Sequence, residues 1–230
     1  MPTPSQPPLV HVIDVRKAYV LGHRTVQALR GLTLEIARGA FVVMQGPSGS
    51  GKTTLLNLIG CIDQPTSGSV LVSGQDTRLL SDTELSHFRA RKLGFVFQSF
   101  NLIPVLTAAE NIEYPLRLIG VPQAQARGRA LAMLDEMGLR EEAAQRPAEL
   151  SGGQCQRVAI GRALVTGPEL VIADEPTANL DSSTGEMIIA IMHRMRDRLG
   201  TTFLISTHDS RVAALAESHW NLRDGLLADS

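Results

Sequence analysis

Residues 46–53 read Gly-Pro-Ser-Gly-Ser-Gly-Lys-Thr, and this stretch decides the fold. It has the form G-x-x-x-x-G-K-[ST], a glycine-rich loop that binds phosphate with backbone N–H groups when a strand precedes it and a helix follows it. The apolar residues 41–44 predict a buried strand that runs into the loop. Residues 53–61 predict a largely buried helix after it. The sequence therefore contains the strand, loop and helix that such a site requires.

The loop is well suited to hold a triphosphate and its metal ion. Glycines at 46, 49 and 51 let backbone N–H groups approach a ligand without obstruction by Cβ. A lysine can reach the β- and γ-oxygens, and the threonine hydroxyl after it can ligate Mg²⁺. The expected nucleotide-binding residues here are Gly46, Pro47, Ser48, Gly49, Ser50, Gly51, Lys52, Thr53 and Thr54. The alternative, an accidental match in a glycine-rich turn, does not explain the flanking strand and helix.

A second apolar strand, residues 170–173, ends in two carboxylates, Asp174 and Glu175. The carboxyl edge of a parallel sheet is where ligands bind in open α/β folds. Asp174 is then placed to hold the Mg²⁺ shell through water, and Glu175 to polarise an attacking water. Taken alone, the pattern is better explained as a strand followed by a solvated acidic turn, because such strings are common. The phosphate loop upstream favours the catalytic interpretation.

A second glycine-rich turn, Ser151-Gly152-Gly153-Gln154, precedes the apolar-periodic residues 158–164. Ser151 can N-cap that helix, and its hydroxyl with the glycine amides can form an anion site. A well-capped helix is the simpler interpretation, but it leaves two glycines unexplained, and each glycine costs helix stability. We therefore expect a ligand to approach this turn closely.

The remaining pattern predicts an α/β fold: a phosphate-loop core with a parallel sheet, an N-terminal antiparallel β subdomain and an inserted helical subdomain. We expect one domain over residues 9–228, with the helical subdomain at about 99–165. Antiparallel strands are predicted at 9–20 and 25–36, joined near Gly22. Pro104, Pro115, Pro122 and Pro147 punctuate the helical stretch 101–150. The other predicted elements are strands 69–73, 93–97 and 202–206, helices 183–199 and 209–216, and a hairpin of 220–222 with 226–228 that turns at Asp224-Gly225.

Composition narrows the function classes. The net charge of the 230 residues is −1, so no basic field favours nucleic acid, and we expect no nucleic-acid partner. The longest apolar run, 187–192, is far below the ~18 residues that span a bilayer. Segment 1–8 is proline-rich without the features of a signal peptide, so we expect a disordered tail. Two cysteines, Cys61 and Cys155, imply no disulfide framework and fit a reducing cytosol.

Taken together, the motifs resemble those of the nucleotide-binding subunits of ATP-binding-cassette (ABC) transporters. Residues 150–154, Leu-Ser-Gly-Gly-Gln, resemble the signature motif of that family. The resemblance covers roughly residues 9–228 and assigns further roles by position. Tyr19 would stack on adenine, Gln98 would contact Mg²⁺ and water, and His208 would contact the γ-phosphate. Asn179-Leu180-Asp181 resembles the D-loop, which places Asp181 at the nucleotide interface.

The resemblance also implies the partners. Two copies would pair head to tail, the phosphate loop of one and the signature of the other closing on the same ATP. The helical subdomain, through residues 97–116, would contact an integral membrane permease and hold the protein peripherally at the cytoplasmic face of the bacterial inner membrane. The chain looks most like the group that drives macrolide export, lipoprotein release and cell-division signalling. Both transport and mechanical signalling without passage of cargo therefore remain open.

Other classes fit the sequence less well. A GTPase would show Asn-Lys-x-Asp, which is absent, and a small-molecule kinase needs no signature turn. Chromosome-structure and DNA-repair ATPases insert long coiled coils between the two motifs, and no sustained heptads occur here. Cys155 departs from the family, which usually has a larger polar residue there. It is either a reactive thiol beside the nucleotide interface, protected by ATP, or a small buried apolar residue.

Overall fold

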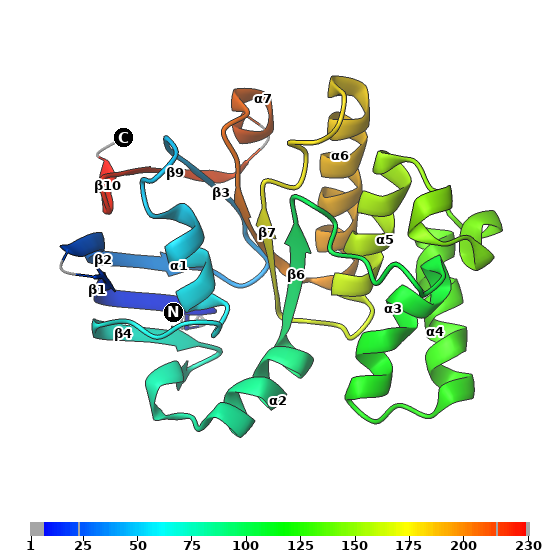
Figure 1. Cartoon of the computed structure of the whole chain (residues 1–230), viewed down its shortest axis with the longest axis horizontal. Helices are drawn as coiled ribbons and strands as arrows, with labels where there is room; N and C mark the ends of the chain where they lie inside the picture. The colour runs from blue at the N-terminus through cyan, green and yellow to red at the C-terminus, as the bar shows by residue number, and fades with distance from the viewer. Residues whose placement is uncertain (1–6, 23, 215, 229–230) are drawn as a thin grey trace, which may run out of the picture.

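The computed structural model describes residues 7–22, 24–214 and 216–228, so the expected tail falls outside it at residues 1–6. A six-stranded sheet of order β10-β9-β3-β8-β7-β6 runs through the centre (Figure 1). Its strands from β9 to β6 are parallel, and β10 pairs antiparallel with β9. They are β3 (Phe41–Gln45), β6 (Leu93–Phe97), β7 (Leu170–Asp174), β8 (Thr202–Ser206), β9 (Ser218–Arg223) and β10 (Leu226–Ala228).

Strands β3, β6, β7 and β8 of the central sheet are largely buried on both faces, which is why they are mostly apolar in sequence. Along β3, Phe41 and Val43 belong to one hydrophobic core, and Val42 and Met44 belong to another. This alternation follows from the two-residue repeat of a strand. The first core lies against four helices of the second half of the chain, and the second core lies against the helix after the phosphate loop and the smaller sheet.

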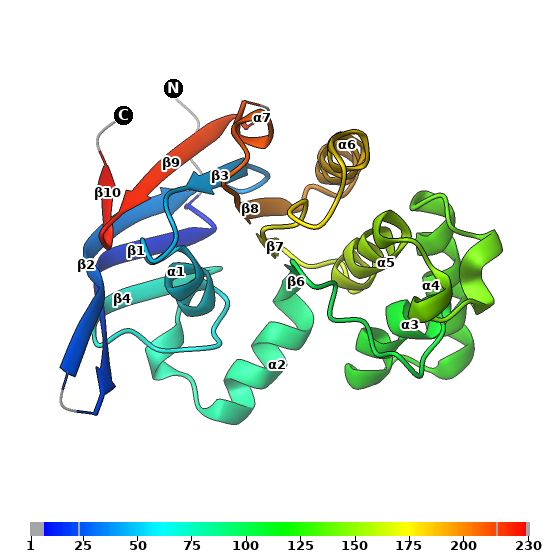
Figure 2. The same ribbon diagram turned by 45° about the horizontal axis from the view of Figure 1, so that its top comes forward.

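The smaller sheet is antiparallel, with order β2-β1-β4-β5. Helix α1 (Lys52–Ile59) lies between the two sheets (Figures 1 and 2) and buries four apolar side chains, Leu55, Leu56, Leu58 and Ile59. The strands are β1 (Val10–Leu21), β2 (Arg24–Ile36), β4 (Ser67–Val72) and β5 (Gln75–Asp76).

The helices on the other side are α3 (Ala108–Leu118), α4 (Gln123–Glu136), α5 (Gly152–Leu164) and α6 (Ser182–Leu199), with 3₁₀ turns at Glu141–Ala144 and Pro147–Glu149. Thr107 and Ser151 start α3 and α5 with capping boxes, in which each side chain accepts the N3 amide. In the described residues, no helix is long and apolar enough to cross a membrane.

The predicted order of strands and helices is confirmed, with four differences. Helix α2 (Asp82–Lys92), the 3₁₀ turn Thr77–Leu79 and β5 were not separately predicted. Helix α1 ends at Ile59, two residues early, because Cys61 has a positive φ of 56°. Pro115 lies inside α3 rather than at its end, and its neighbour Leu116 is fully buried in the core. Helix α7 covers Ser210–Ala213, shorter than the expected 209–216, of which Leu215 is outside the described residues.

Candidate functional site

The loop between β3 and α1 needs glycine at two positions for reasons of packing. Gly46 has φ 152° and Gly51 has φ 106°. A Cβ on Gly46 would lie 2.1 Å from the carbonyl oxygen of Leu222 in β9, and one on Gly51 would lie 2.6 Å from that of Ala28 in β2. From the sequence alone, these glycines are expected to allow close approach of a ligand. The structure adds that neighbouring strands leave no room for a side chain.

The N-terminus of α1 offers donors to an anion. Its N-cap, Gly51, has no side chain that could accept a helix amide, so the first N–H groups lack a side-chain cap. The Lys52 ammonium lies over the loop and donates to the carbonyl oxygens of Gly46 at 2.7 Å and Pro47 at 3.1 Å. The positive end of the helix dipole adds to this charge. The loop therefore concentrates positive potential at one point.

Asp174 ends β7 directly beside this loop. The hydroxyl of Ser206, its register partner on β8, donates to Oδ1, and the Thr53 hydroxyl donates to Oδ2 at 3.3 Å. Both carboxylate oxygens are therefore oriented by neighbouring hydroxyls. Carboxylate and hydroxyl oxygens are the hard donors that Mg²⁺ prefers, usually with waters and substrate phosphate completing the shell. The donor set here fits that ion.

Glu175 adopts an uncommon backbone conformation, with φ 49°. Its N–H donates to the carbonyl oxygen of Ser206 at 3.0 Å, which holds the turn. A non-glycine residue in this region costs about 1–3 kcal/mol and is found most often at functional sites. The carboxylate Oε2 lies 2.9 Å from Nδ1 of His208, so the two predicted catalytic side chains are in direct contact.

These groups surround one cavity of about 550 Å³. It is lined by most of the residues predicted from the first two motifs, together with Gln98 at the end of β6 and His208. The predicted lining residues are Ser48, Gly49, Gly51, Lys52, Thr53, Thr54, Gln98, Asp174, Glu175 and His208. Val26, Gln27 and Ala28 of β2 complete the wall and were not predicted.

The second glycine-rich turn lies elsewhere. Both views place β6 and β7 between α1 and α5 (Figures 1 and 2). Ser151 N-caps α5 as expected: its hydroxyl accepts the Gln154 amide at 3.2 Å, and Gln154 Oε1 accepts the Ser151 amide at 2.8 Å. Residues 151–154 line a separate cavity of about 290 Å³ with Asn179, Leu180 and Asp181. Among the described residues, the two predicted anion sites of one chain therefore do not share a cavity.

Comparison with known proteins agrees with this geometry. The family model described as ABC transporter matches residues 29–178. The chain belongs to the ABC transporter family. As a cassette of this family it binds ATP and is an ATPase.

Three similar proteins illustrate the relationship of this cassette to others of the family. It is 44% identical to MJ0796, whose dimeric structure is a post-hydrolysis state bound to ADP and Pi, with a TM-score of 0.88 over 96% of this chain and 97% of that one. An ABC transporter ATP-binding protein of Thermotoga maritima is 45% identical over 94% of this chain and 92% of its own length. The macrolide export ATP-binding/permease protein MacB of Syntrophobacter fumaroxidans is 47% identical over 95% of this chain.

The cassette spans only 31% of the length of that MacB protein. It also spans 34% of the MacB protein of Escherichia coli strain K12, to which it is 45% identical. The similarity to these relatives therefore concerns their ATP-binding part.

Tyr19, the expected adenine-stacking residue of the cassette, is held by Asp63. Its hydroxyl donates to Asp63 Oδ2 at 2.9 Å, and the Lys17 ammonium lies 5.0 Å from the ring centroid. Partial burial, and next the contact with Asp63, raise the pKa of Tyr19. Tyr19 does not line the 550 Å³ cavity, so its contact with adenine stays a prediction.

Asp181 of the expected D-loop is the N-cap of α6. It accepts the Thr184 amide at 3.0 Å and the hydroxyls of Ser183 and Thr184 at 2.6 Å each. These hydrogen bonds, from Ser183 first and then Thr184, lower the pKa of Asp181. Its neighbour Asn179 donates to the Gln98 carbonyl oxygen at 3.0 Å, which joins the D-loop to the end of β6.

Cys155 is a buried side chain rather than an accessible thiol. It is 6% exposed, its Sγ lies 3.5 Å from the Pro147 carbonyl oxygen, and burial raises the pKa of the thiol. The reactive species is the thiolate, which a raised pKa disfavours. The structure therefore favours the apolar alternative for this residue.

Sequence reasoning did not identify Ser206, whose hydroxyl orients Asp174. A signal for it exists: it is the last residue of a predicted strand, 202–206, and parallel register sets it opposite Asp174. The order of strands in the sheet is needed to use that signal, and a single sequence does not supply it.

Proposed function

We propose that this chain is the ATP-hydrolysing subunit of a membrane transporter of the export or lipoprotein- and lipid-extraction type. It would associate peripherally with the cytoplasmic face of the bacterial inner membrane, through an integral membrane permease. The similarity to the ATP-binding part of MacB proteins named for macrolide export supports this type.

Within the site, Lys52 and the amides of the phosphate loop bind the β- and γ-phosphates. Glu175 is the general base that polarises the attacking water, and the 2.9 Å contact with His208 fixes its carboxylate. His208 also faces the cavity, where its ring can contact the γ-phosphate. Thr53, Gln98 and Asp174, the last through water, would hold Mg²⁺, which neutralises phosphate charge when bound.

The proposal that two copies act together rests on one observation, the separation of the two anion sites. The phosphate loop lies in a cavity with every predicted catalytic side chain, whereas Ser151–Gln154 and Asp181 lie in another. A head-to-tail homodimer would bring the signature of one chain onto the ATP of the other. MJ0796, a similar cassette, has been solved as a dimer. ATP would then link two helix N-termini, and hydrolysis would break the link.

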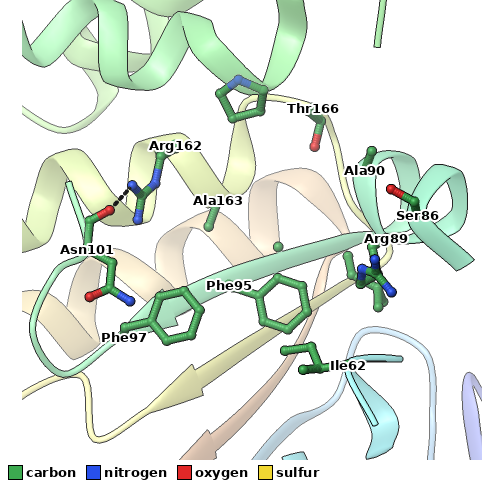
Figure 3. Close-up of a pocket in the computed structure, with 13 residues that line it drawn as sticks. Ile62, Ser86, Arg89, Ala90, Phe95, Phe97, Asn101, Arg162, Ala163 and Thr166 are labelled. Carbon is green, nitrogen blue, oxygen red and sulfur yellow. Dashed lines mark hydrogen bonds between the residues drawn. The ribbon is translucent and has the colours of Figure 1, made fainter. Parts of the chain in front are cut away.

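A groove of about 430 Å³ provides a docking place for the permease (Figure 3). It lies between α2, β6 and the helical part, and three of its lining residues, Phe97, Asn101 and Pro115, come from the predicted contact segment 97–116. Phe95, Phe97 and Ile62 make part of its wall apolar, and Ile62 is 52% exposed. An apolar helix end of a membrane subunit would bury this surface. The helical subdomain, about 99–165, would then transmit its movement to the permease.

The substitution Glu175→Gln tests the function. It removes the base and keeps the shape, so hydrolysis should fall roughly 10²–10⁴-fold while ATP binding remains. ATP should then hold two copies together, and sedimentation with Mg²⁺ and ATP should show a dimer that dissociates when ATP is removed.

Glu35→Gln is the matched control. Glu35 is an exposed carboxylate on β2 that pairs with His11 at 3.3 Å, away from both cavities. It should leave hydrolysis and association unchanged. Normal hydrolysis by Glu175→Gln would contradict the assigned base, and a monomer at saturating ATP would contradict the shared site.

A further inference from the structure

Arg162, on α5, holds the loop that follows β6. Its Nη2 donates to the Phe100 carbonyl oxygen at 2.8 Å, and its Nη1 donates to that of Asn101, a bond drawn in Figure 3. A guanidinium can hold two acceptors at once because its donors form a rigid, planar fork. Burial lowers the pKa of Arg162. A partly buried cation that binds two carbonyl oxygens of an irregular segment fixes the shape of that segment.

The loop that it holds is strained. Phe100 has φ 62° and Asn101 has φ 48°, both in the left-handed region. Consecutive non-glycine residues rarely adopt this conformation, and surrounding contacts must maintain it. The two residues whose carbonyls Arg162 binds are the two strained residues. Arg162 is therefore well placed to maintain the shape of this segment.

The other end of the loop is Gln98, which lines the nucleotide cavity. Its carbonyl oxygen accepts from Asn179 at 3.0 Å, so side chains hold the segment 98–101 at both ends. Asn101 at the Arg162 end and Phe97 just before Gln98 both line the groove proposed for the permease, as does Arg162 itself (Figure 3). One side chain thus joins α5, the groove and the loop that carries Gln98.

We propose that Arg162 is a positioning residue for ATP hydrolysis, which sets Gln98 in the nucleotide cavity by holding the strained carbonyls of Phe100 and Asn101. This inference rests on the proposed role of Gln98 at the Mg²⁺ and the water. Arg162 does not line the nucleotide cavity, so it would act through Gln98 and not on ATP itself. Its loss therefore lowers kcat and leaves the affinity for ATP almost unchanged.

The test is a double-mutant cycle on the full chain. Arg162→Met keeps much of the length of the side chain and removes its donors, and we expect kcat to fall roughly tenfold with the Kd of ATP changed by less than about twofold. Gln98→Ala should lower kcat by itself. If Arg162 acts through Gln98, adding Arg162→Met to Gln98→Ala should lower kcat by less than about a further twofold.

Arg129→Met is the matched control. Arg129, on α4, donates to the carbonyl oxygen of Val165, the C-cap of α5, at 2.8 Å, and lies outside the loop and both cavities. It should leave kcat unchanged. Circular dichroism checks folding, and if Arg162→Met does not fold, Arg162→Lys replaces it, because lysine keeps the charge and loses the fork.

The results of these experiments distinguish the positioning role of Arg162 from the proposed function of the site. Full additivity of Arg162 and Gln98 would overturn the positioning role, as would an increase in the Kd of ATP with kcat unchanged. An unaltered kcat in Gln98→Ala would overturn the role of Gln98 and this inference with it. The assignment of the general base would then still be decided by Glu175→Gln.

Discussion

Helices α1 and α5 both begin at a glycine-rich turn, and the two turns differ in how their first amides are satisfied. The α1 turn has a glycine N-cap in the left-handed region and no side-chain cap. The α5 turn has a serine N-cap and a complete capping box. The first is flanked by Lys52, Asp174 and Glu175, and the second by Asn179 and Asp181.

The difference shows how one cassette can separate two tasks. An uncapped helix N-terminus beside a lysine can bind a phosphate by itself. The capped α5 turn offers fewer free amides, and the cation in its cavity, Arg157, donates to the Met137 carbonyl oxygen at 2.8 Å. We therefore expect this turn to act only on a nucleotide that is already bound elsewhere. The α1 turn should therefore govern binding, and the α5 turn should govern the ATP-dependent pairing of two copies.

Lys52→Ala should have the largest effect on binding. Loss of the ammonium removes charge-assisted hydrogen bonds to phosphate, so the Kd of ATP should rise roughly 10²–10³-fold, measured by isothermal titration calorimetry. Lys92→Ala is the matched control, because Lys92 pairs with Glu169 and lies outside the nucleotide cavity. If Lys52→Ala binds ATP with unchanged affinity, the α1 turn does not govern binding and the proposed difference between the two turns is wrong.

Ser151→Ala tests the α5 turn. We expect ATP-dependent association and kcat to fall roughly tenfold, while the Kd of ATP for the single chain stays unchanged. Ser81→Ala is the matched control: Ser81 forms the same capping box with Glu84 at the start of α2. Both variants should lose about 1 kcal/mol of stability, and only Ser151→Ala should lose activity. Equal activity in the two would assign Ser151 to capping alone.

Ser206→Ala tests how Asp174 is oriented in the nucleotide cavity. Without this hydroxyl Asp174 loses one of its two fixed partners, so kcat should fall roughly fivefold and more Mg²⁺ should be needed for half-maximal rate. Ser73→Ala makes the same change to a serine that donates to a carboxylate, Glu169, at 2.8 Å and outside the nucleotide cavity. A similar loss of rate in both would point to a general effect on stability.

Glu169→Gln should affect stability alone and has the smallest expected effect. Burial opposes ionisation, but Lys92, Arg38 and Ser73 outweigh it and lower the pKa of Glu169 to about 2. The ionised form therefore stabilises the fold above about pH 4.5, and this contribution is lost as the pH falls towards 2. At pH 7 the variant should melt roughly 2–4 °C lower, for about 1 kcal/mol after solvent screening. The Tm difference should shrink between pH 4.5 and 2.

Much of this architecture could be predicted from the sequence, since the decisive features are local. The phosphate loop, the strand before Asp174 and the serine cap of α5 each depend on a few consecutive residues. Patterns of this kind need no knowledge of which strands are neighbours.

Features that depend on packing between distant segments could not be predicted. Ser206 acts through the register of β7 with β8, and Arg162 acts through a loop 61 and 62 residues away in sequence. Helix α2 has only a weak apolar pattern in the sequence, because the side chains that it buries are Leu85 and Phe88. The separation of the two turns likewise depends on the order of strands in the sheet.

The crowding around Gly46 and Gly51 has a consequence for how descendants of this cassette would diverge. Carbonyl oxygens of Leu222 and Ala28 exclude a side chain there, whether or not a nucleotide is ever bound. An inactive descendant of this cassette would thus retain both glycines for folding, while substitutions of Lys52 and Glu175 would be tolerated. Loss of those two side chains, and not the integrity of the glycine pattern, would mark a copy that no longer hydrolyses ATP.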